Sequence, residues 1–357
     1  MVIRSRIVWE IRKYMNERGY MEVETPILWN GVGGANATPF IIKAEGNDGE
    51  NSAFGEKKKE REDYCLRIAP ELFLKQMVVG GFDKVFEIGK VFRNEGTDRT
   101  HNPEFTTMEM YKAYTDVEEL IEFTEELLRT IMKNIFNTTK FVVEEGDPKN
   151  KSSKEKVNGI QEDGEIDFGK PFKRVYIYKE LEKVFGTARY KEIINNKEEL
   201  IEFIAARTAS QENRDSKVQE LKAQRLEDLV DYVIEEYIEK KVITSRQPTV
   251  VIGHPVSQSP LSKESEIMRG FCNRFEVYVN GKELVNAYEE LNDPFEQQRR
   301  FEIQQKGEEL AENDRKYCQV LEYGLPPTGG WGMGIDRLVM MLTDTQQIRD
   351  VISFGLF

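Results

Sequence analysis

The chain has 357 residues, with 51 basic and 64 acidic side chains and a formal net charge of −13 at pH 7. Hydrophobic residues make up 39% of it, which is enough for a folded core and excludes a disordered chain. The acidic balance argues against bulk nucleic-acid binding through phosphate neutralisation. No apolar run is long enough to span a bilayer and the start of the chain is charged throughout, so we expect no membrane partner and a cytoplasmic location.

Cysteine and histidine are scarce. Three cysteines are far apart in sequence and odd in number, which excludes a disulfide framework and a CxxC metal site. The two histidines, His101 and His254, provide no His-rich zinc site. Carboxylates could still bind a hard cation, so we expect any metal to resemble magnesium.

The first half of the chain predicts two helices separated by strands and polar loops. Residues 4–18 have helical spacing and stop at Gly19, and residues 20–25 alternate as a strand that Pro26 ends. A second apolar helical stripe runs through 117–135 and begins after Asp116, with Glu119 three residues later. The very polar segments 44–63 and 144–164 predict solvated loops.

The second half predicts helices followed by strands. Residues 179–241 read as charged amphipathic helices, and strands are expected at 249–252 and 274–279. Asn280-Gly281 is the strongest hairpin signal in the chain. These patterns predict an α+β fold with an antiparallel sheet flanked by helices. We divide the chain into a first part of the main domain (1–178), a helical insertion (179–248) and a second part (249–357).

Two glycine-containing stretches do not match nucleotide-binding motifs. Residues 164–170 fit GxxxxGK, but Pro171 stands where a Ser or Thr should reach magnesium. The glycines of 330–334 lack both GxGxxG spacing and a βαβ context, which excludes a Rossmann turn.

The most informative segment is 84–114, where two alternating apolar runs flank a polar loop and predict a long-looped hairpin. Period-two alternation would place Arg93 with Glu95 on one face, and likewise Glu109 with Tyr111. An arginine on a rigid strand can clamp an anionic substrate through its planar fork. The alternative is that these residues are ordinary cross-strand surface pairs.

The hairpin around Asn280-Gly281 carries a second group of candidate residues. Glu276 and Glu283 flank the turn closely enough to share one cation, and the alternating positions beyond them are Asn286, Tyr288 and Glu290. The alternative is an acidic, solvated hairpin. Further along, the glycine-rich stretch 329–334 leads into an apolar helix with Arg337 in its first turn. A cation gains nothing from that end of the helix dipole, so an anionic ligand explains Arg337 better.

These separated stretches coincide with the three signature motifs of the class II aminoacyl-tRNA synthetases, and in detail they resemble the cytosolic lysyl-tRNA synthetases. The matching stretches are RSRIVWEIRKYMNERGYMEVETP, GGANATPF, RIAPEL, FRNEG, HNPEFT, NRFEVYVNGKELVNAYEELNDP and EYGLPPTGGWGMGIDRLVMMLTDTQQIRDVI. The resemblance implies an antiparallel sheet of six or seven strands and a homodimer formed through motif 1. It also implies that L-lysine, ATP and Mg2+ give lysyl-adenylate, whose lysyl group passes to the acceptor end of tRNA(Lys) in protein biosynthesis.

The resemblance also implies roles for single residues. Arg93 would hold the α-phosphate and the substrate carboxylate, and Glu276 and Glu283 would bind the metal. The remaining ATP-binding positions are Glu95, His101, Asn102, Phe105 and Arg337, and Arg93 and Arg337 are the catalytic pair. The lysine-binding positions, besides Arg93, are Gly34, Glu71, Glu109, Tyr111, Asn286, Tyr288 and Glu290.

Some features depart from the family pattern. The full-length enzymes carry an N-terminal OB-fold domain that reads the anticodon, whereas this chain begins at motif 1, so the resemblance implies the catalytic domain alone. Val32 replaces the usual proline, and Glu289 stands where Ser or Thr is commoner, which adds a negative charge beside the expected lysine pocket. Two alternatives remain open: a stand-alone paralogue that lysylates a protein acceptor of the elongation factor P type, and a non-catalytic regulatory paralogue.

Overall fold

The structure is a computed structural model that describes residues 1–31, 33–35, 37–43, 64–142, 165–208, 213–305 and 311–355, the Ile243 side chain excepted. It has the predicted α+β fold, with mainly antiparallel sheet strands flanked by helices. The chain folds into two compact units. The first comprises Met1–Tyr114, Asn292–Met340 and Thr345–Phe357, and the second comprises Thr115–Leu291 and Met341–Asp344. The two predicted polar loops, 44–63 and 144–164, lie outside the described residues.

The first unit begins with helix α1 (Val2–Glu17), whose apolar stripe is buried and which gives way to Gly19 at a φ of +75°. Both features were predicted. The strand that follows, β1 (Met21–Glu22), is shorter than the predicted 20–25. The reason is that Thr25 donates from its backbone N–H and its hydroxyl to the Glu87 carboxylate, instead of continuing the ladder.

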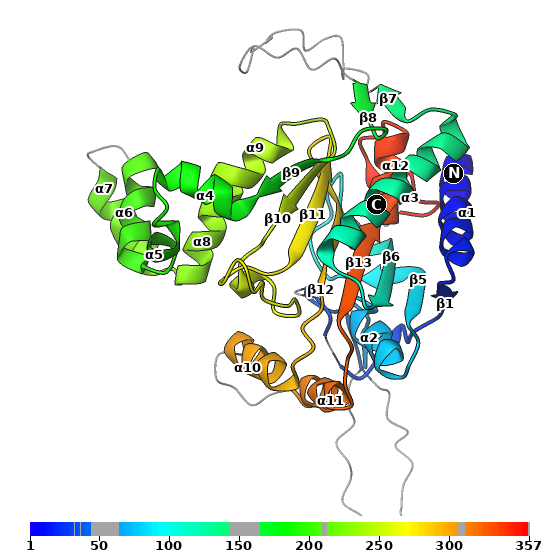
Figure 1. Ribbon diagram of the computed structural model, residues 1–357, viewed down its shortest axis with the longest axis horizontal. Coiled ribbons are helices and arrows are strands. Elements are labelled where there is room, and N and C mark those ends of the chain that lie inside the picture. Colours follow the sequence, from blue (N-terminus) through cyan, green and yellow to red (C-terminus); the bar gives the residue numbers. More distant parts are fainter. Residues whose placement is uncertain are drawn as a thin grey trace, which may run out of the picture. The chain divides into compact units, whose positions relative to one another are not determined.

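The predicted long-looped hairpin is present in the first unit (Figure 1). Strands β5 (Lys84–Phe92) and β6 (Glu104–Ala113) pair antiparallel, β1 pairs parallel with β5, and β13 (Thr328–Gly334) pairs antiparallel with β6. Helix α2 (Glu71–Val79) packs on β5 and β6. Helix α12 (Ile335–Leu342) starts directly after β13, so the glycine-rich stretch is a strand that leads into a helix.

A small second sheet also belongs to the first unit. Its strands, in spatial order, are β2 (Leu28–Trp29), β4 (Tyr64–Leu66) and β3 (Ile41–Ile42). Four of its apolar side chains are exposed, namely Leu28, Ile41, Ile42 and Tyr64. The unit is completed by α10 (Pro294–Gln304), α11 (Glu312–Leu321) and the 3-10 turn η5 (Ile348–Asp350).

The second unit begins with α3 (Val117–Phe136), which is entered as predicted: the Asp116 side chain accepts a hydrogen bond from the Glu119 N–H. The helix buries its apolar stripe. After it, β7 (Lys140–Val142) pairs antiparallel with β8 (Glu165–Asp167).

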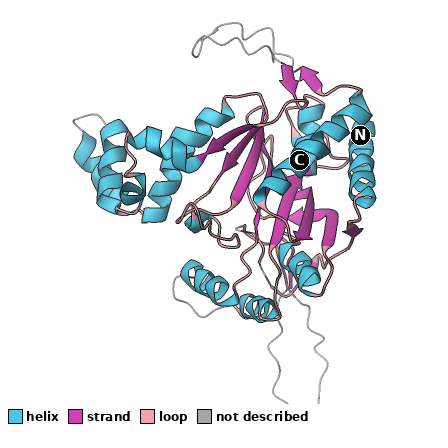
Figure 2. Ribbon diagram, in the orientation of Figure 1, coloured by secondary structure: helices cyan, strands magenta, loops and turns pink. Residues whose placement is uncertain are grey.

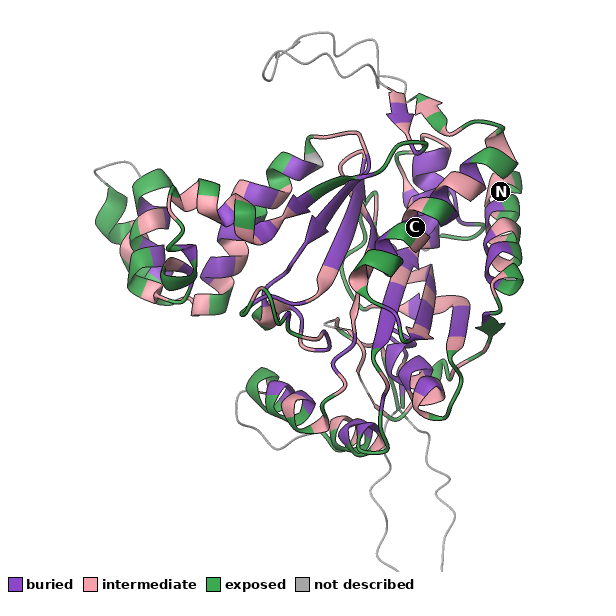
Figure 3. Cartoon of the chain, in the orientation of Figure 1, coloured by how far each residue is buried: buried purple, intermediate pink, exposed green. Residues whose placement is uncertain are grey.

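The sheet strands of the second unit are β9 (Lys173–Tyr176), β10 (Thr249–Ile252), β11 (Arg274–Val279) and β12 (Lys282–Glu289). Strand β10 pairs parallel with β9 and antiparallel with β11, which forms the predicted hairpin with β12. Asn280 and Gly281 both have positive φ, 48° and 73°, as a two-residue hairpin turn requires. All four residues of β10 are buried (Figure 3).

Helices fill the stretch between β9 and β10, as the amphipathic pattern predicted (Figure 2). They are α4 (Ile177–Phe185), α5 (Tyr190–Ile194), α6 (Lys197–Thr208), α7 (Arg214–Lys222), α8 (Leu226–Ile234), the π-helical η3 (Glu235–Glu239) and α9 (Lys240–Ile243). Their apolar faces share one core with Val251, Phe271 and Tyr278. Among the described residues, no helix combines the length and apolarity that crossing a bilayer would require.

Candidate active site

Arg93 follows directly after β5, in the loop that joins β5 to β6. Its guanidinium carbon lies 5.2 Å from the centroid of the Phe105 ring, and its Nε donates to the Ile68 carbonyl at 3.4 Å. The strand ends at Phe92, so the predicted period-two alternation does not extend to Arg93 and Glu95. Glu95 is exposed in the loop, where its N–H donates to the Arg93 carbonyl. The structure therefore brings Arg93 to Phe105 through the loop and not through a strand face.

The same loop contacts the start of α12. Arg337 Nη2 lies 3.1 Å from His101 Nε2, and His101 Nδ1 lies 2.8 Å from Asp98 Oδ2. Because an arginine can only donate, His101 accepts at Nε2 and carries its proton at Nδ1. Hydrogen bonds hold the pKa of the Asp98 carboxyl well below its usual range. The one from the Thr100 backbone N–H has the largest effect, and the one with the His101 side chain comes next. Asn102 is buried and donates from Nδ2 to the Glu104 carbonyl at 2.6 Å.

A further set of contacts, at the start of α12, was not foreseen from the sequence. The Arg4 guanidinium is ion-paired with the buried Asp336 carboxylate and also donates to Thr106 Oγ1 at 2.9 Å. Asp336 Oδ2 accepts from the Thr106 N–H at 2.6 Å. These bonds connect α1, β6 and the first turn of α12. No local pattern signals this, because Arg4 and Asp336 are 332 residues apart.

Gly34 and Glu71, both predicted to bind the amino acid, are neighbours in the first unit. Gly34 has a φ of +84°, and a Cβ there would lie 3.3 Å from Glu71 Cβ. Glu71 opens α2, and its Oε1 is paired with the fully buried Lys75 Nζ at 2.6 Å. Sequence reasoning predicted neither this helix nor the role of Lys75; within a helix, the i,i+4 spacing of the two opposite charges indicates the pair.

Glu109 and Tyr111 share one face of β6, as predicted. The Tyr111 hydroxyl donates to Glu109 Oε2 at 3.2 Å. Removal of water from around the Glu109 carboxyl, together with the charge of Glu71, raises its pKa to about 8, and the opposing charge of Arg93 offsets this only in part. Glu71, Arg93, Glu109 and Tyr111 thus lie within electrostatic reach of one another, and we refer to them as the first-unit cluster.

In the second unit, candidate residues share one face of the β11–β12 hairpin. Tyr278 lies opposite Glu283, and a register shift after Val277 puts Asn286, not Val285, opposite Glu276. Glu276, Glu283 and Asn286 are therefore on the same side of the hairpin. Two carboxylates on one face are oxygen donors of the kind that Mg2+ prefers, so this part of the chain fits a magnesium ion.

Tyr288 lies on the same face, opposite Arg274. Glu290 falls just beyond β12, where it forms an isolated bridge with Ser262, and it is almost completely buried. The predicted alternation of Asn286, Tyr288 and Glu290 is thus present for two strand residues and continues one position past the strand.

Glu276 is held by several polar groups of its own unit. Its Oε1 is ion-paired with Arg274, its Oε2 accepts from the Tyr278 hydroxyl at 2.7 Å, and His254 Nε2 lies 3.6 Å from Oε2. Burial alone would raise the pKa of Glu276, but His254, Arg274 and Tyr278 together hold it well below its usual range.

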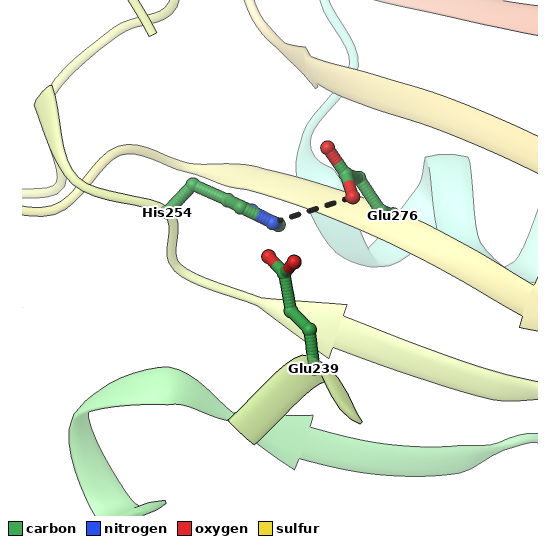
Figure 4. Close-up of side chains that lie close together, drawn as sticks. All are labelled: Glu239, His254 and Glu276. Atoms are coloured by element: carbon green, nitrogen blue, oxygen red, sulfur yellow. Dashed lines mark ion pairs between the residues drawn. The ribbon is translucent and has the colours of Figure 1, made fainter. Parts of the chain in front are cut away.

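Two further titratable groups lie beside Glu276 (Figure 4). Burial lowers the pKa of His254, and the charge of Glu276 opposes this shift. Burial, followed by the charge of Glu276, raises the pKa of Glu239 to about 7. Glu239 comes from the helical insertion, and sequence reasoning identified neither residue as part of a site.

Glu289 does not lie where the sequence suggested. Its Oε1 accepts from the Val117 N–H at 3.2 Å and its Oε2 from Asn273 Nδ2 at 2.9 Å. Because successive residues of a strand point to opposite faces, Glu289 lies across β12 from Tyr288. Its charge stabilises the N-terminus of α3 and is not added beside Tyr288.

The two units offer complementary chemistry. The first carries arginines and an aromatic ring that can bind a phosphate and stack on a base, together with a carboxyl and a hydroxyl that can bind an ammonium group. The second carries carboxylates on one hairpin face that can bind a cation.

Comparison with known proteins connects this chemistry to a family. A family model described as tRNA synthetases class II (D, K and N) matches residues 1–356. The chain is 45% identical over 363 residues to the probable cytoplasmic lysine–tRNA ligase of Enterocytozoon bieneusi, covering 99% of this chain and 63% of that protein. It is 42% identical over 360 residues to the lysine–tRNA ligase of Lactococcus lactis subsp. cremoris, covering 99% and 64%.

Similar coverage is found for the lysine–tRNA ligase of Enterococcus faecalis, which is 41% identical over 357 residues, with 98% of this chain and 62% of the relative covered. The chain thus spans slightly less than two thirds of the length of these curated relatives.

Proposed function

The chain belongs to the class II tRNA synthetases of the D, K and N group, and from that premise we propose that it is the catalytic core of a lysine–tRNA ligase. The lysine carboxylate attacks the α-phosphorus of ATP, the bond to pyrophosphate breaks, and lysyl-adenylate forms. A ribose hydroxyl at the acceptor end of tRNA(Lys) then attacks the acyl carbon, and AMP leaves. The relatives named lysine–tRNA ligase favour lysine among the family's amino acids.

The observation that carries this proposal is the first-unit cluster. Arg93 lies within electrostatic reach of Glu109 and contacts the Phe105 ring, while Tyr111 donates to Glu109. Arg93 can bind a carboxylate, and the neighbouring Glu109 and Tyr111 can accept hydrogen bonds from an ammonium group. An amino acid carries both of these charged groups. We assign to Arg93 the α-phosphate and the substrate carboxylate, so that it positions the reacting atoms and offsets charge in the transition state.

The rest of the ATP site is assigned to the β5–β6 loop and the start of α12. Phe105 would stack on the adenine ring, Arg337 would cover its other face and reach the γ-phosphate, and Glu95 would accept from the adenine amino group. His101 and Asn102 would line the phosphates. The contact between Arg337 and His101 supports a common role, because it joins loop and helix in one unit.

Lysine selectivity is assigned to groups that meet the two ends of the amino acid. Tyr111 and Glu290 would bind the ε-ammonium, Tyr288 would line the aliphatic stem and Glu109 would lie nearby. Gly34 and Glu71 would take the α-amino group, with Asn286 at the carboxylate. A desolvated carboxylate left without its ammonium is costly, so neutral isosteres would be rejected.

Magnesium is assigned to Glu276 and Glu283, which share a hairpin face. When bound, Mg2+ would neutralise the phosphate oxygens of ATP. Arg274 and Tyr278 orient the Glu276 carboxylate from the protein side.

We also propose that two copies associate through motif 1. In and directly before motif 1 the apolar side chains of Val2, Trp9 and Met21 are exposed, and exposed apolar side chains of this kind support an interface there. Residues 1–178 and 249–357 would then form the catalytic domain around an insertion at 179–248. A cytoplasmic location agrees with the name of the Enterocytozoon bieneusi relative.

ATP–pyrophosphate exchange in the presence of single amino acids tests the proposal. Exchange should require lysine and fail with aspartate and asparagine. Exchange without lysine, or none in a folded protein, would contradict it. Transfer of labelled lysine to tRNA(Lys) or to a protein acceptor would then decide between a tRNA ligase and a protein-modifying paralogue.

A further inference from the structure

Glu239, His254 and Glu276 come from three elements of the second unit and point toward one another (Figure 4). Glu239 ends the π-helical turn η3, His254 follows β10, and Glu276 lies in β11. One candidate ligand atom from each, an imidazole nitrogen and two carboxylate oxygens, lies within 4.8 Å of the other two. We refer to these residues as the Glu-His-Glu cluster.

His254 is the unusual member of the cluster. It is 2% exposed, and within the described part of the chain neither of its ring nitrogens makes a hydrogen bond. A buried polar group without a hydrogen bond costs free energy, so such a group calls for an explanation. A bound ligand that uses the imidazole lone pair would supply one.

The distance from His254 Nε2 to Glu276 Oε2 is informative. At 3.6 Å it is longer than a protein hydrogen bond. Two ligand atoms at tetrahedral positions around a zinc ion, with bonds of about 2.1 Å, are separated by roughly 3.4 Å. The observed spacing therefore fits two ligands of one ion better than a direct hydrogen bond.

The charges around the cluster also favour a bound cation. Arg274 is paired with Glu276 and offsets that carboxylate. A carboxylate oxygen of Glu239 lies within 4.8 Å of a Glu276 oxygen and of a His254 ring nitrogen, so a second carboxylate faces the same point. A divalent cation would offset this excess negative charge. The Tyr278 hydroxyl, which donates to Glu276 Oε2 at 2.7 Å, would orient that ligand from the outer shell.

We propose that Glu239, His254 and Glu276 form a binding site for a divalent transition-metal ion of the zinc class. A neutral imidazole with two carboxylates is a donor set that Zn2+ accepts and Mg2+ does not favour. Three protein ligands leave a fourth position for water. The donor set thus differs from the two carboxylates assigned to magnesium, although Glu276 belongs to both.

Because Glu276 is shared, zinc binding should affect activity; this expectation rests on the proposed function. With Zn2+ bound, Glu276 would be drawn toward His254 and Glu239 and away from the magnesium of ATP. Zinc occupancy should therefore inhibit lysine-dependent exchange, and because both ions need Glu276, excess Mg2+ should relieve that inhibition in part.

Titration calorimetry of the metal-free full chain with Zn2+ and with Mg2+ tests the site without any activity measurement. We expect one Zn2+ per chain at this site, and a loss of affinity of at least 10-fold in His254→Gln and in Glu239→Gln. His101→Gln, which changes the other histidine, is the matched control and should bind Zn2+ as the unmodified chain does. Absorption of bound Co2+ should indicate an imidazole ligand that disappears in His254→Gln.

Two results would overturn the proposal: no Zn2+ binding by the unmodified chain, or binding that both variants retain unchanged. If His254→Gln fails to fold, Glu239→Gln decides alone, because its isosteric amide lies at the edge of the site. Zinc binding without lysine-dependent exchange would uphold the site and reject the proposed function. Exchange without zinc binding would do the reverse, and in an active chain Glu239→Gln should also lose zinc inhibition.

Discussion

The two units of the chain hold their charged residues in different ways. In the first, Arg93 lies against the Phe105 ring and a backbone carbonyl, and among the described residues it lies in the field of Glu109 but forms no ion pair with a carboxylate. In the second, Glu276 is directly paired with Arg274 of its own strand and accepts from Tyr278. An anionic substrate can therefore approach Arg93 without breaking an ion pair, whereas a cation at Glu276 has to share it with Arg274. Arg274 thus already neutralises part of the Glu276 charge in the second unit.

The most severe test of this contrast is Arg93→Ala. It should lower lysine-dependent ATP–pyrophosphate exchange by roughly 100- to 1000-fold, because a preorganised donor to the transition state is lost. Circular dichroism and thermal unfolding should be unchanged. Lys90→Ala is the matched control: it removes a cation from the same hairpin whose exposed pair with Glu104 contributes little, and exchange should stay within twofold. A modest loss in Arg93→Ala would place the reacting phosphate elsewhere.

A smaller effect is expected from Tyr111→Phe. Removing the hydroxyl that donates to Glu109 should raise the KM for lysine roughly 10-fold and leave the KM for ATP nearly unchanged. Exchange measured across lysine concentrations gives both constants. Tyr114→Phe changes an exposed tyrosine just beyond the same strand and serves as the control. An equal effect on both substrates would assign Tyr111 a general packing role.

Glu109 allows a test through pH. Its folded-state pKa, raised to about 8 from an ordinary 4.5, makes ionisation harder in the folded chain than in the unfolded one. The free energy of unfolding should therefore fall as pH rises from about 4.5 to 8, and Glu109→Gln should remove that part of the fall. We expect the variant to be more stable than the parent by roughly 1–2 kcal/mol at pH 8, and equal to it at pH 4.

Denaturant unfolding at both pH values measures the difference. A variant that is no more stable at pH 8 than at pH 4, relative to the parent, would show that Glu109 is well solvated in the folded chain. Lysine binding, by contrast, should be weakened in Glu109→Gln at pH 8, where part of the parent's Glu109 is ionised.

The smallest effect concerns helix capping. Asp116→Ala removes the side chain that caps α3 in the second unit and should lower the free energy of unfolding by about 1 kcal/mol. Asp293→Ala removes the equivalent cap of α10 in the first unit and is the matched variant. Comparing the two by denaturant unfolding shows whether the units unfold together. Two separate unfolding transitions, one shifted by each variant, would mean that each unit unfolds cooperatively by itself.

The sequence predicted most of the fold because its signals are local. The α3 stripe with its Asp116 cap, the Asn280-Gly281 turn and the long-looped hairpin all follow from residues close together in the chain, and all are present. The predicted strand 20–25 was too long, because Thr25 bonds a distant carboxylate. The pairing of Arg4 with Asp336 could not be foreseen, since it joins the two ends of the chain.

Sequence motifs identified the candidate residues, and the structure shows which contacts fix the side chains of some of them. Glu109 and Tyr111 alternate on a real strand, so their contact follows from period two. Arg93 lies past the end of its strand, where no periodicity fixes the direction of a side chain. The Glu-His-Glu cluster depends on three elements meeting, and the burial of His254 has no signature in the sequence.

The hydrogen bond from the Val117 N–H to the Glu289 carboxylate restrains the position of β12. At one end the tight turn at Asn280 and Gly281 fixes the alignment of this strand, and at the other end Glu289 anchors it to the first turn of α3. A slip of one position would turn Asn286 and Tyr288 to the opposite side of the sheet and would also take the Glu289 carboxylate away from the Val117 N–H. The strand is thus restrained at one end by its turn and at the other by its hydrogen bond to α3.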